Sequence, residues 1–164
     1  MRLDLREIIA LEGSSLPFDC ELEGELPDFP PVKAYNGAPR AQGRVFNEAG
    51  VLRLEGTLTA PMTCLCDRCG AEFDSVKVTD LDAVLVGSES EDHPEYFVLD
   101  GFELDLDELL STCLILDMET KFLCREDCKG LCPRCGRNLN LGPCSCRKES
   151  DPRFAVLEQL LDKQ

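Results

Sequence analysis

Hydrophobic and polar residues alternate most regularly over residues 43–60. In this stretch Leu52, Leu54 and Leu58 are separated by charged residues and threonines. A two-residue period is that of a β-strand with one face buried. The tripeptide E-A-G at residues 48–50 is typical of a turn, so the residues before it are expected to pair back as a hairpin.

A second alternating run extends from Phe73 to Val86 and passes through Val76 and Val78. It predicts a strand that returns along the first one. The sequence C-D-R-C-G lies between the two runs, so it should form the turn at the tip of this hairpin. A polar loop follows, and residues 96–99 are a further short strand candidate.

The apolar period changes to that of a helix near Asp105. Asp105 can cap the free N–H groups of the first turn, and Glu108 completes the spacing of a capping box. One apolar face follows at helical spacing, formed by Leu106, Leu109, Leu110, Cys113 and Leu114. A last helix is predicted to begin at Asp151 and Pro152.

Residues 1–30 read as a strand or short helix followed by an extended arm that prolines close. The predicted fold class is therefore α+β, with a small antiparallel β-sheet, a packed helix, a cysteine-rich metal-binding segment and a C-terminal helix. We divide the chain into an α+β body, residues 1–120, which carries the first C-x2-C turn, and residues 121–164, which hold the cysteine-rich segment and the terminal helix.

Eleven cysteines stand in this sequence of 164 residues, and six of them lie between residues 124 and 146. Two C-x-R-C-G turns have the spacing that places two thiolates on one side of a tetrahedral metal, with a glycine that permits the reversal. The candidate metal ligands are Cys66, Cys69, Cys124, Cys128, Cys132, Cys135, Cys144 and Cys146.

Two partitions of these cysteines are open. One joins the two matched turns, Cys66 and Cys69 with Cys132 and Cys135, and leaves the other four for a second site. The other is local: four of the six tail cysteines close one site, and the first pair stays separate. A short loop costs less entropy to close, which slightly favours a local site built on Cys132 and Cys135.

Zinc is the expected metal. The tail spacing C-x3-C-x3-C-P departs from the ferredoxin run, which argues against an iron–sulfur cluster, although C-P-x-C-G also occurs at rubredoxin-type iron sites. A redox-regulated binding protein or chaperone is the alternative, because Arg68 and Arg134 inside the turns would lower the pKa of neighbouring thiols.

Charge is distributed unevenly along this acidic chain, whose net charge is −15. Residues 61–101 carry ten acidic and two basic residues, residues 102–120 carry six acidic and none basic, and residues 121–153 carry eight basic and four acidic. The body should therefore repel a phosphate backbone, while the cysteine-rich segment could tolerate one.

The first residues lack the pattern of a signal peptide, and no apolar run is long enough for a membrane span. We expect a cytoplasmic protein, in which clustered cysteines bind metal rather than form disulfides. The single histidine, His93, lies in a polar loop, and no nucleotide-binding or hydrolase motif occurs. The sequence predicts neither an enzyme nor a small-molecule substrate.

The stretch F-L-C-R-E-D-C-K-G-L-C-P-R-C-G-R-N-L-N-L-G-P-C-S-C, followed by D-P-R-F-A-V-L-E-Q-L, resembles the bacterial YceD/YlbN family of large ribosomal RNA subunit accumulation proteins. The opening L-D-L-R-E-I-I, the C-D-R-C turn and the acidic helix occur in the same order. This resemblance implies a role in ribosome biogenesis, namely the accumulation or processing of large-subunit ribosomal RNA.

From the resemblance and the charge pattern we expect a non-catalytic assembly factor. Its partner would be precursor large-subunit rRNA or a basic ribosomal protein. Strong nonspecific RNA binding conflicts with the net charge, because affinity for nucleic acid rests largely on cations that displace counterions. The candidate contact residues are Arg134, Arg137, Arg147 and Lys148.

Overall fold

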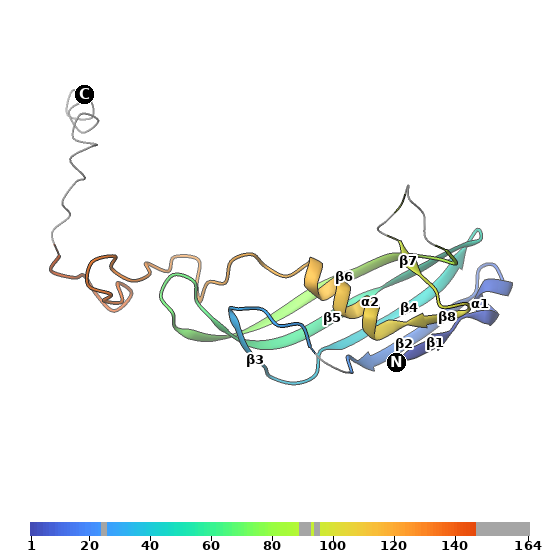
Figure 1. Ribbon diagram of the computed structural model, residues 1–164, viewed down its shortest axis with the longest axis horizontal. Helices are drawn as coiled ribbons and strands as arrows, with labels where there is room; N and C mark the ends of the chain where they lie inside the picture. Colours follow the sequence, from blue (N-terminus) through green and yellow to red (C-terminus); the bar gives the residue numbers. More distant parts are fainter. Residues whose placement is uncertain (24–25, 89–92, 94–95, 147–164) are drawn as a thin grey trace, which may run out of the picture.

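The computed structural model describes residues 1–23, 26–88, 93 and 96–146, and their fold is α+β, as predicted (Figure 1). The elements are β1 (Arg2–Asp4), α1 (Arg6–Ala10), β2 (Ser15–Glu21), β3 (Val32–Tyr35), β4 (Arg40–Glu48), β5 (Val51–Leu65), β6 (Glu72–Val86), β7 (Phe97–Val98), β8 (Glu103–Asp105) and α2 (Leu106–Leu116).

The main sheet has the strand order β2-β4-β5-β6-β7, and β3 pairs with the C-terminal end of β5. Both predicted hairpins are confirmed: β4 with β5, and β5 with β6. Ala49 and Gly50 both have positive φ angles, of 52° and 84°, at the tight turn between β4 and β5. Strand β7 joins the edge of β6 in parallel, an orientation that the sequence pattern did not predict.

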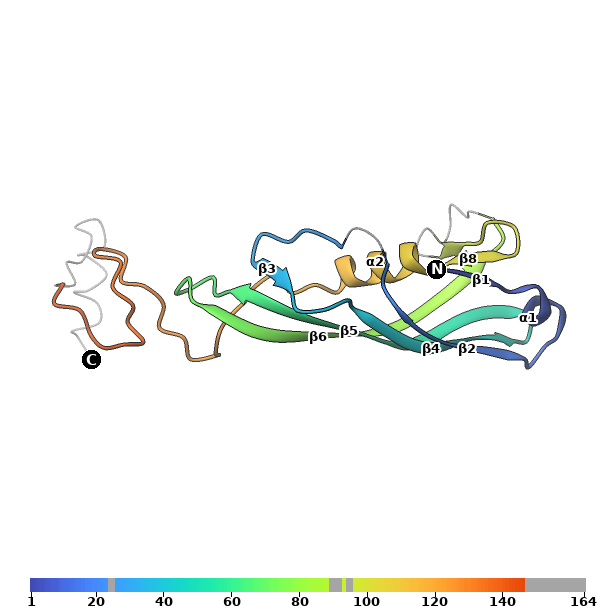
Figure 2. The same cartoon turned by 90° about the horizontal axis from the view of Figure 1, so that it is seen from below.

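Helix α2 covers one face of the main sheet, which Figure 2 shows most clearly. Leu54 and Leu58 of β5 and Leu109 and Leu110 of α2 are almost completely buried in the core. Each fully buried leucine contributes roughly 1.5–3 kcal/mol of transfer free energy. Asp105 caps α2 by accepting a hydrogen bond from the backbone N–H of Glu108 at 3.3 Å, so the predicted helix start is confirmed.

The opposite face of the main sheet is open to solvent and carries cross-strand ion pairs. These pairs are Arg40 with Asp19, Arg44 with Glu55, and Arg53 with Asp82. One buried face and one solvated face account for the two-residue period in β5 and β6. Within the described residues, no helix has the length and apolar character needed to cross a membrane.

Residues 1–21 contain both a short helix and two strands, where the sequence left a strand or a helix open. The C-terminal helix predicted from Asp151 lies outside the described residues. The division at residue 120 stays a prediction. In Figure 1 the segment after α2 runs to the tip of the β5–β6 hairpin and continues beyond it, at the opposite end of the molecule from α1.

Candidate metal centre

The tip of the β5–β6 hairpin positions the first pair of cysteines. Strand β5 ends directly before Cys66, and the chain reverses before β6 begins. The N–H of Gly70 donates to the carbonyl of Cys66 at 2.8 Å, and the N–H of Cys66 donates to the carbonyl of Ala71 at 2.9 Å. Gly70 has a φ of 67°, which favours glycine. This turn places the Cys66 and Cys69 sulfurs side by side.

A reciprocal pair of hydrogen bonds brings the segment after α2 to this turn. The backbone N–H of Asp67 donates to the carbonyl of Phe122 at 2.9 Å, and the N–H of Phe122 donates to the Asp67 carboxylate at 2.6 Å. The Phe122 ring is buried with Met62 and Cys64. This contact fixes the chain just before Cys124.

The first cluster consists of Cys66, Cys69, Cys124 and Cys128, whose sulfurs all lie within 4.8 Å of one another. The sulfur–sulfur distance is 3.8 Å between Cys66 and Cys128 and 3.8 Å between Cys69 and Cys124. A tetrahedron with a zinc–sulfur distance of about 2.3 Å has edges of about 3.8 Å. These spacings therefore fit a tetrahedral metal ion.

The second cluster consists of Cys132, Cys135, Cys144 and Cys146, again within 4.8 Å of one another. Its turn repeats the hydrogen bonds of the first: the N–H of Gly136 donates to the carbonyl of Cys132 at 2.9 Å, and the N–H of Cys132 donates to the carbonyl of Arg137 at 2.8 Å. The sulfurs of Cys132 and Cys144 are 3.4 Å apart. The matched sequences thus form matched turns, one in each cluster.

Asn140 connects the two clusters. Its side-chain amide donates to the sulfur of Cys128 at 3.3 Å, and its side-chain oxygen accepts from the N–H of Lys129 at 2.8 Å. The N–H of Leu131 also donates to the carbonyl of Arg68, at 3.0 Å. A residue that lies between the cysteines of the second cluster therefore orients a ligand atom of the first cluster. The spacing of the cysteine motifs contained no signal for this role.

Backbone N–H groups stabilise the thiolates of Cys66 and Cys132. Burial opposes ionisation of Cys66, but N–H groups of Cys124, Cys69 and Arg68 outweigh it and lower the pKa of this thiol to about 6. The N–H groups of Cys135 and Arg134 lower the pKa of Cys132 to about 6 as well. Arg68 and Arg134 were expected to lower the pKa of neighbouring thiols, and in the structure they do so through their backbone N–H groups. The guanidinium of Arg68 instead donates to the carbonyl of Cys128, at 2.8 Å.

The neighbouring thiols raise other pKa values in the same clusters. Burial and the thiols of Cys66, Cys69 and Cys128 raise the pKa of Cys124 to about 12. The Cys135 thiol and burial raise the pKa of Cys146 to about 12. Four sulfurs this close cannot all ionise without a positive charge among them, and a divalent cation supplies that charge. The donor set therefore fits a thiophilic cation such as zinc.

Neither partition expected from the sequence describes these clusters completely. A local group built on Cys132 and Cys135 is present, but Cys66 and Cys69 are not separate from the tail. They join Cys124 and Cys128 because the segment after α2 returns to the hairpin tip. The matched turns do not share a site. Outside the clusters, Cys20 and Cys113 are half-buried, and Cys64 is fully buried in the sheet.

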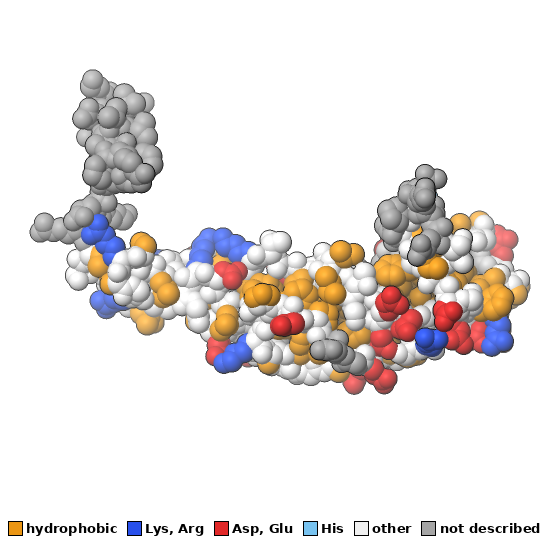
Figure 3. All heavy atoms as spheres, in the orientation of Figure 1, with side chains coloured by type: hydrophobic (Ala, Val, Ile, Leu, Met, Phe, Trp, Pro, Cys, Tyr) orange, Lys and Arg blue, Asp and Glu red, His pale blue; other side chains and the backbone are white. Residues whose placement is uncertain are grey.

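The basic residues expected to contact a partner lie in the second turn and after it. Arg134 and Arg137 are exposed beside the second cluster, while Arg147 and Lys148 lie outside the described residues. Figure 3 shows basic side chains toward the end that carries the cysteine clusters, while acidic side chains with some basic ones among them lie over the sheet body.

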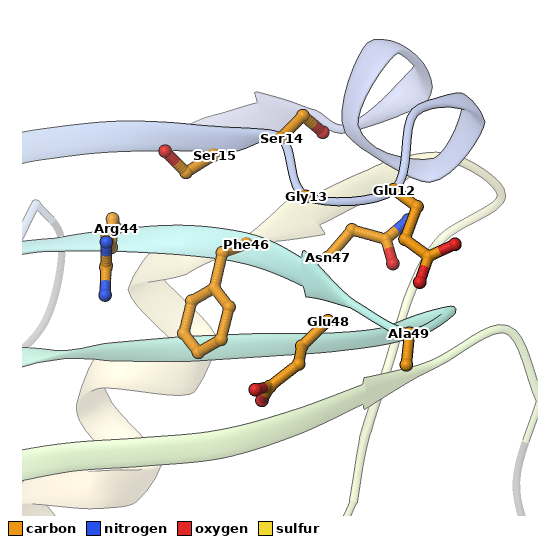
Figure 4. Close-up of a pocket in the computed structure, with 9 residues that line it drawn as sticks. All are labelled: Glu12, Gly13, Ser14, Ser15, Arg44, Phe46, Asn47, Glu48 and Ala49. Carbon is orange, nitrogen blue, oxygen red and sulfur yellow. The ribbon is translucent and has the colours of Figure 1, made fainter.

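A shallow depression of about 370 Å³ lies at the other end of the molecule, beside β4 (Figure 4). Three of its polar side chains already have partners within the protein. The Ser14 hydroxyl donates to the carbonyl of Leu11, the Asn47 amide donates to the carbonyl of Ile8, and Arg44 pairs with a glutamate of β5.

The family model described as "Large ribosomal RNA subunit accumulation protein YceD" matches residues 54–161. The chain belongs to the YceD family. The matched span includes both clusters, the β5–β6 hairpin from Leu54 onward, and α2. The resemblance seen in the sequence is thereby confirmed.

Relatives of this YceD-family chain occur in bacteria and plants. An uncharacterised protein of Mycobacterium tuberculosis is 32% identical over 117 residues, which cover 68% of this chain and 56% of the relative. One from Mycobacterium leprae is 33% identical over 125 residues, 72% of this chain and 57% of the relative. The Arabidopsis thaliana protein named "Large ribosomal RNA subunit accumulation protein YCED homolog 1, chloroplastic" is 25% identical over 168 residues, 80% of this chain and 52% of the relative.

The chain thus spans about half the length of the curated relatives that it matches. No solved structure matches it.

Proposed function

We propose that this YceD-family protein is a non-catalytic, cytoplasmic factor in the accumulation of large-subunit ribosomal RNA. It binds precursor rRNA or a basic ribosomal protein, and it holds structural zinc in both cysteine clusters. One observation carries the proposal: two four-sulfur groups build the end of the molecule that also exposes basic side chains. The family description agrees with such a role.

Zinc in this protein would stabilise a segment that has little other support. The described residues after α2, 117–146, form no helix and no strand beyond one isolated bridge between Leu131 and Asn138. Phe122 is the main apolar anchor of this segment. Four thiolates leave no open coordination position for water or substrate, which is the arrangement of a structural site rather than a catalytic one.

The basic turn of the second cluster is the proposed contact with precursor rRNA. Arg134 and Arg137 project from a turn whose backbone the cluster fixes, and Arg147 and Lys148 follow in the sequence. A few cations on a rigid turn suit a focused phosphate contact, while the acidic body limits nonspecific binding. The negative charge of the acidic body would attract the alternative partner, a basic ribosomal protein.

Sedimentation of the protein in a cell lysate tests this function. Comigration with large-subunit precursors, abolished by ribonuclease or by reversing the charge at Arg134, Arg137, Arg147 and Lys148, is the expected result. Arg6→Glu, on α1 at the far end, is the control and should leave comigration unchanged. Retained comigration of the fourfold variant would contradict the basic contact, and free sedimentation of the wild type would contradict stable binding to the precursor.

A further inference from the structure

One edge of β6 is unpaired over most of its length. Strand β6 pairs with β5 from Glu72 to Leu85, whereas β7 pairs with its other edge only at Leu85 and Val86. Among the described residues, no strand pairs with that other edge from Glu72 to Val84. A row of unpaired N–H and C=O groups is a template for another strand.

Two hydrogen bonds identify which backbone groups lie along this edge. The N–H of Cys66 donates to the carbonyl of Ala71 within the β5–β6 hairpin. The backbone N–H and C=O groups of the odd-numbered residues of β6 therefore point toward β5. On the other side of β6, the N–H of Leu99 donates to the carbonyl of Val86. The backbone N–H and C=O groups of the even-numbered residues therefore point away from β5. The register between β5 and β6 has no shift. The free edge is therefore formed by the N–H and C=O groups of Asp74, Val76, Val78, Asp80, Asp82 and Val84.

The side chains of the free edge point to the open face of the sheet and form a distinct pattern. Val76 and Val78 are 60% and 54% exposed, although both are β-branched and apolar. Asp74 and Asp80 flank them, and Asp80 has no hydrogen-bond or ion-pair partner among the described residues. The edge thus offers two apolar positions between two carboxylates.

Contacts on the buried face hold this strand rigid. Lys77 is only 8% exposed, and its ammonium binds the carboxylates of Asp117 at 2.9 Å and Glu119 at 3.1 Å. These bonds join β6 to the segment that follows α2. An incoming strand would therefore meet a preorganised edge and would cost little ordering of the protein itself.

The free edge has no proline and no bulge, and its charged positions are the aspartates on the open face and the inward Lys77. Its charge nevertheless opposes a second copy of this chain. In an antiparallel pair centred on Lys77, Val76 would lie opposite Val78 of the other copy, but Asp74 would lie opposite Asp80. Like charges directly opposite one another destabilise a sheet. A partner strand with cations at those positions would be attracted instead.

We infer that the free edge of β6 binds an extended segment of a basic protein as an added strand. The segment carries two apolar residues at alternate positions, with lysine or arginine next on each side along the same face. Backbone hydrogen bonds supply affinity, and the valines and carboxylates select the sequence. This site deepens the proposed function, on which it rests for the partner being a component of the large-subunit precursor.

Peptide binding to the purified full chain tests the site directly. The probe is a fluorescently labelled synthetic peptide, K-T-K-T-V-T-V-T-K-T-K, and the control peptide has glutamate at each lysine position. Val78→Pro removes an N–H that faces the free edge and leaves the β5 ladder intact. Val78→Thr is the matched variant that keeps this N–H. Fluorescence anisotropy is measured at low salt.

We expect the lysine peptide to bind and the glutamate peptide to fail. Val78→Pro should weaken binding by at least roughly tenfold, and Val78→Thr should stay close to the wild type. Equal binding of both peptides, absence of binding, or unchanged binding by Val78→Pro would overturn the inference. So would concentration-dependent dimers of the wild type that Val78→Pro dissolves, since these would identify a second copy as the occupant.

Comparison of peptide binding with the sedimentation of the wild-type protein in a lysate separates this inference from the proposed function. If wild-type protein comigrates with precursors but peptide binding fails, the assembly role stands and the edge site falls. If the peptide binds the edge but wild-type protein does not comigrate, the proposed function falls, and with it the identification of the partner as a precursor component.

Discussion

Phe122 and Asp67 hold each other through two hydrogen bonds although 55 residues separate them. One bond joins two backbone groups, and the other joins the Phe122 N–H to the Asp67 carboxylate. Asp67 lies between the first two cysteines of the hairpin turn, and Phe122 precedes the next two. This contact therefore assembles the first cluster from two distant parts of the chain.

Replacing Asp67 with alanine should weaken the attachment of this segment to the hairpin tip. The Phe122 N–H would lose its acceptor, at a cost of about 1–2 kcal/mol. Hydrogen exchange of the Phe122 amide should accelerate in Asp67→Ala and should stay slow in Asp67→Asn, which keeps an acceptor oxygen. Equal exchange rates in both variants would show that the metal cluster alone fixes the segment.

Metal content should report the two clusters separately. We expect two zinc ions per chain by native mass spectrometry, because each cluster offers four sulfurs. Cys132→Ser with Cys135→Ser should remove one ion, and Cys66→Ser with Cys69→Ser should remove the other. Cys20→Ser, outside both clusters, should retain two. If either double variant lost both ions, the clusters would have to form as one unit.

Chelation should disorder the cysteine-rich segment without unfolding the sheet. The body has its own hydrophobic core, built by α2 and one face of the main sheet, whereas residues 121–146 depend mainly on the clusters. Amide signals of β4 and β5 should persist after zinc removal, while those of residues 123–146 lose dispersion. Collapse of the whole spectrum would show that the metal also holds the body together.

Gly130→Ala should destabilise the first cluster more than Gly70→Ala does. Both glycines have positive φ angles, of 72° and 67°. A Cβ at Gly130 would also lie 2.9 Å from the carbonyl oxygen of Arg68, whereas a Cβ at Gly70 would meet no atom within 4 Å. The backbone conformation alone costs an alanine about 1–2 kcal/mol, and the clash adds to it only at Gly130. Faster zinc release to a chelator from Gly130→Ala is the expected measurement, and equal rates would exclude the clash.

Because of Lys77, the free energy of unfolding of the protein should depend on pH in the alkaline range. Burial opposes its charge, but hydrogen bonds to Asp117 and Glu119 outweigh burial and raise its pKa above the ordinary 10.5. The stabilisation is therefore complete below pH 10.5 and is lost as pH rises through the higher folded pKa. The free energy of unfolding of the wild type should fall relative to Lys77→Met above pH 10.5. Parallel pH profiles would show that Lys77 has the same pKa in both states.

The local elements of this protein follow from short-range patterns in its sequence. Leu52, Leu54 and Leu58 alternate with polar residues, so the solvated face and the buried face of β5 could be assigned without coordinates. Asp105 and Glu108 mark the start of α2 through backbone capping, which is a short-range interaction. The C-x-R-C-G turns likewise follow from spacing and a glycine. Each of these features depends on residues close together in the chain.

The grouping of the cysteines into clusters, in contrast, depends on packing between distant segments. Loop entropy favoured a local grouping, but it could not account for the contact between Asp67 and Phe122, which brings Cys124 and Cys128 to the hairpin tip. The roles of Asn140 and Lys77 and the free edge of β6 also depend on packing between distant segments. Long-range contacts of this kind leave no periodic pattern in a single sequence, because their partners are set by the fold rather than by spacing.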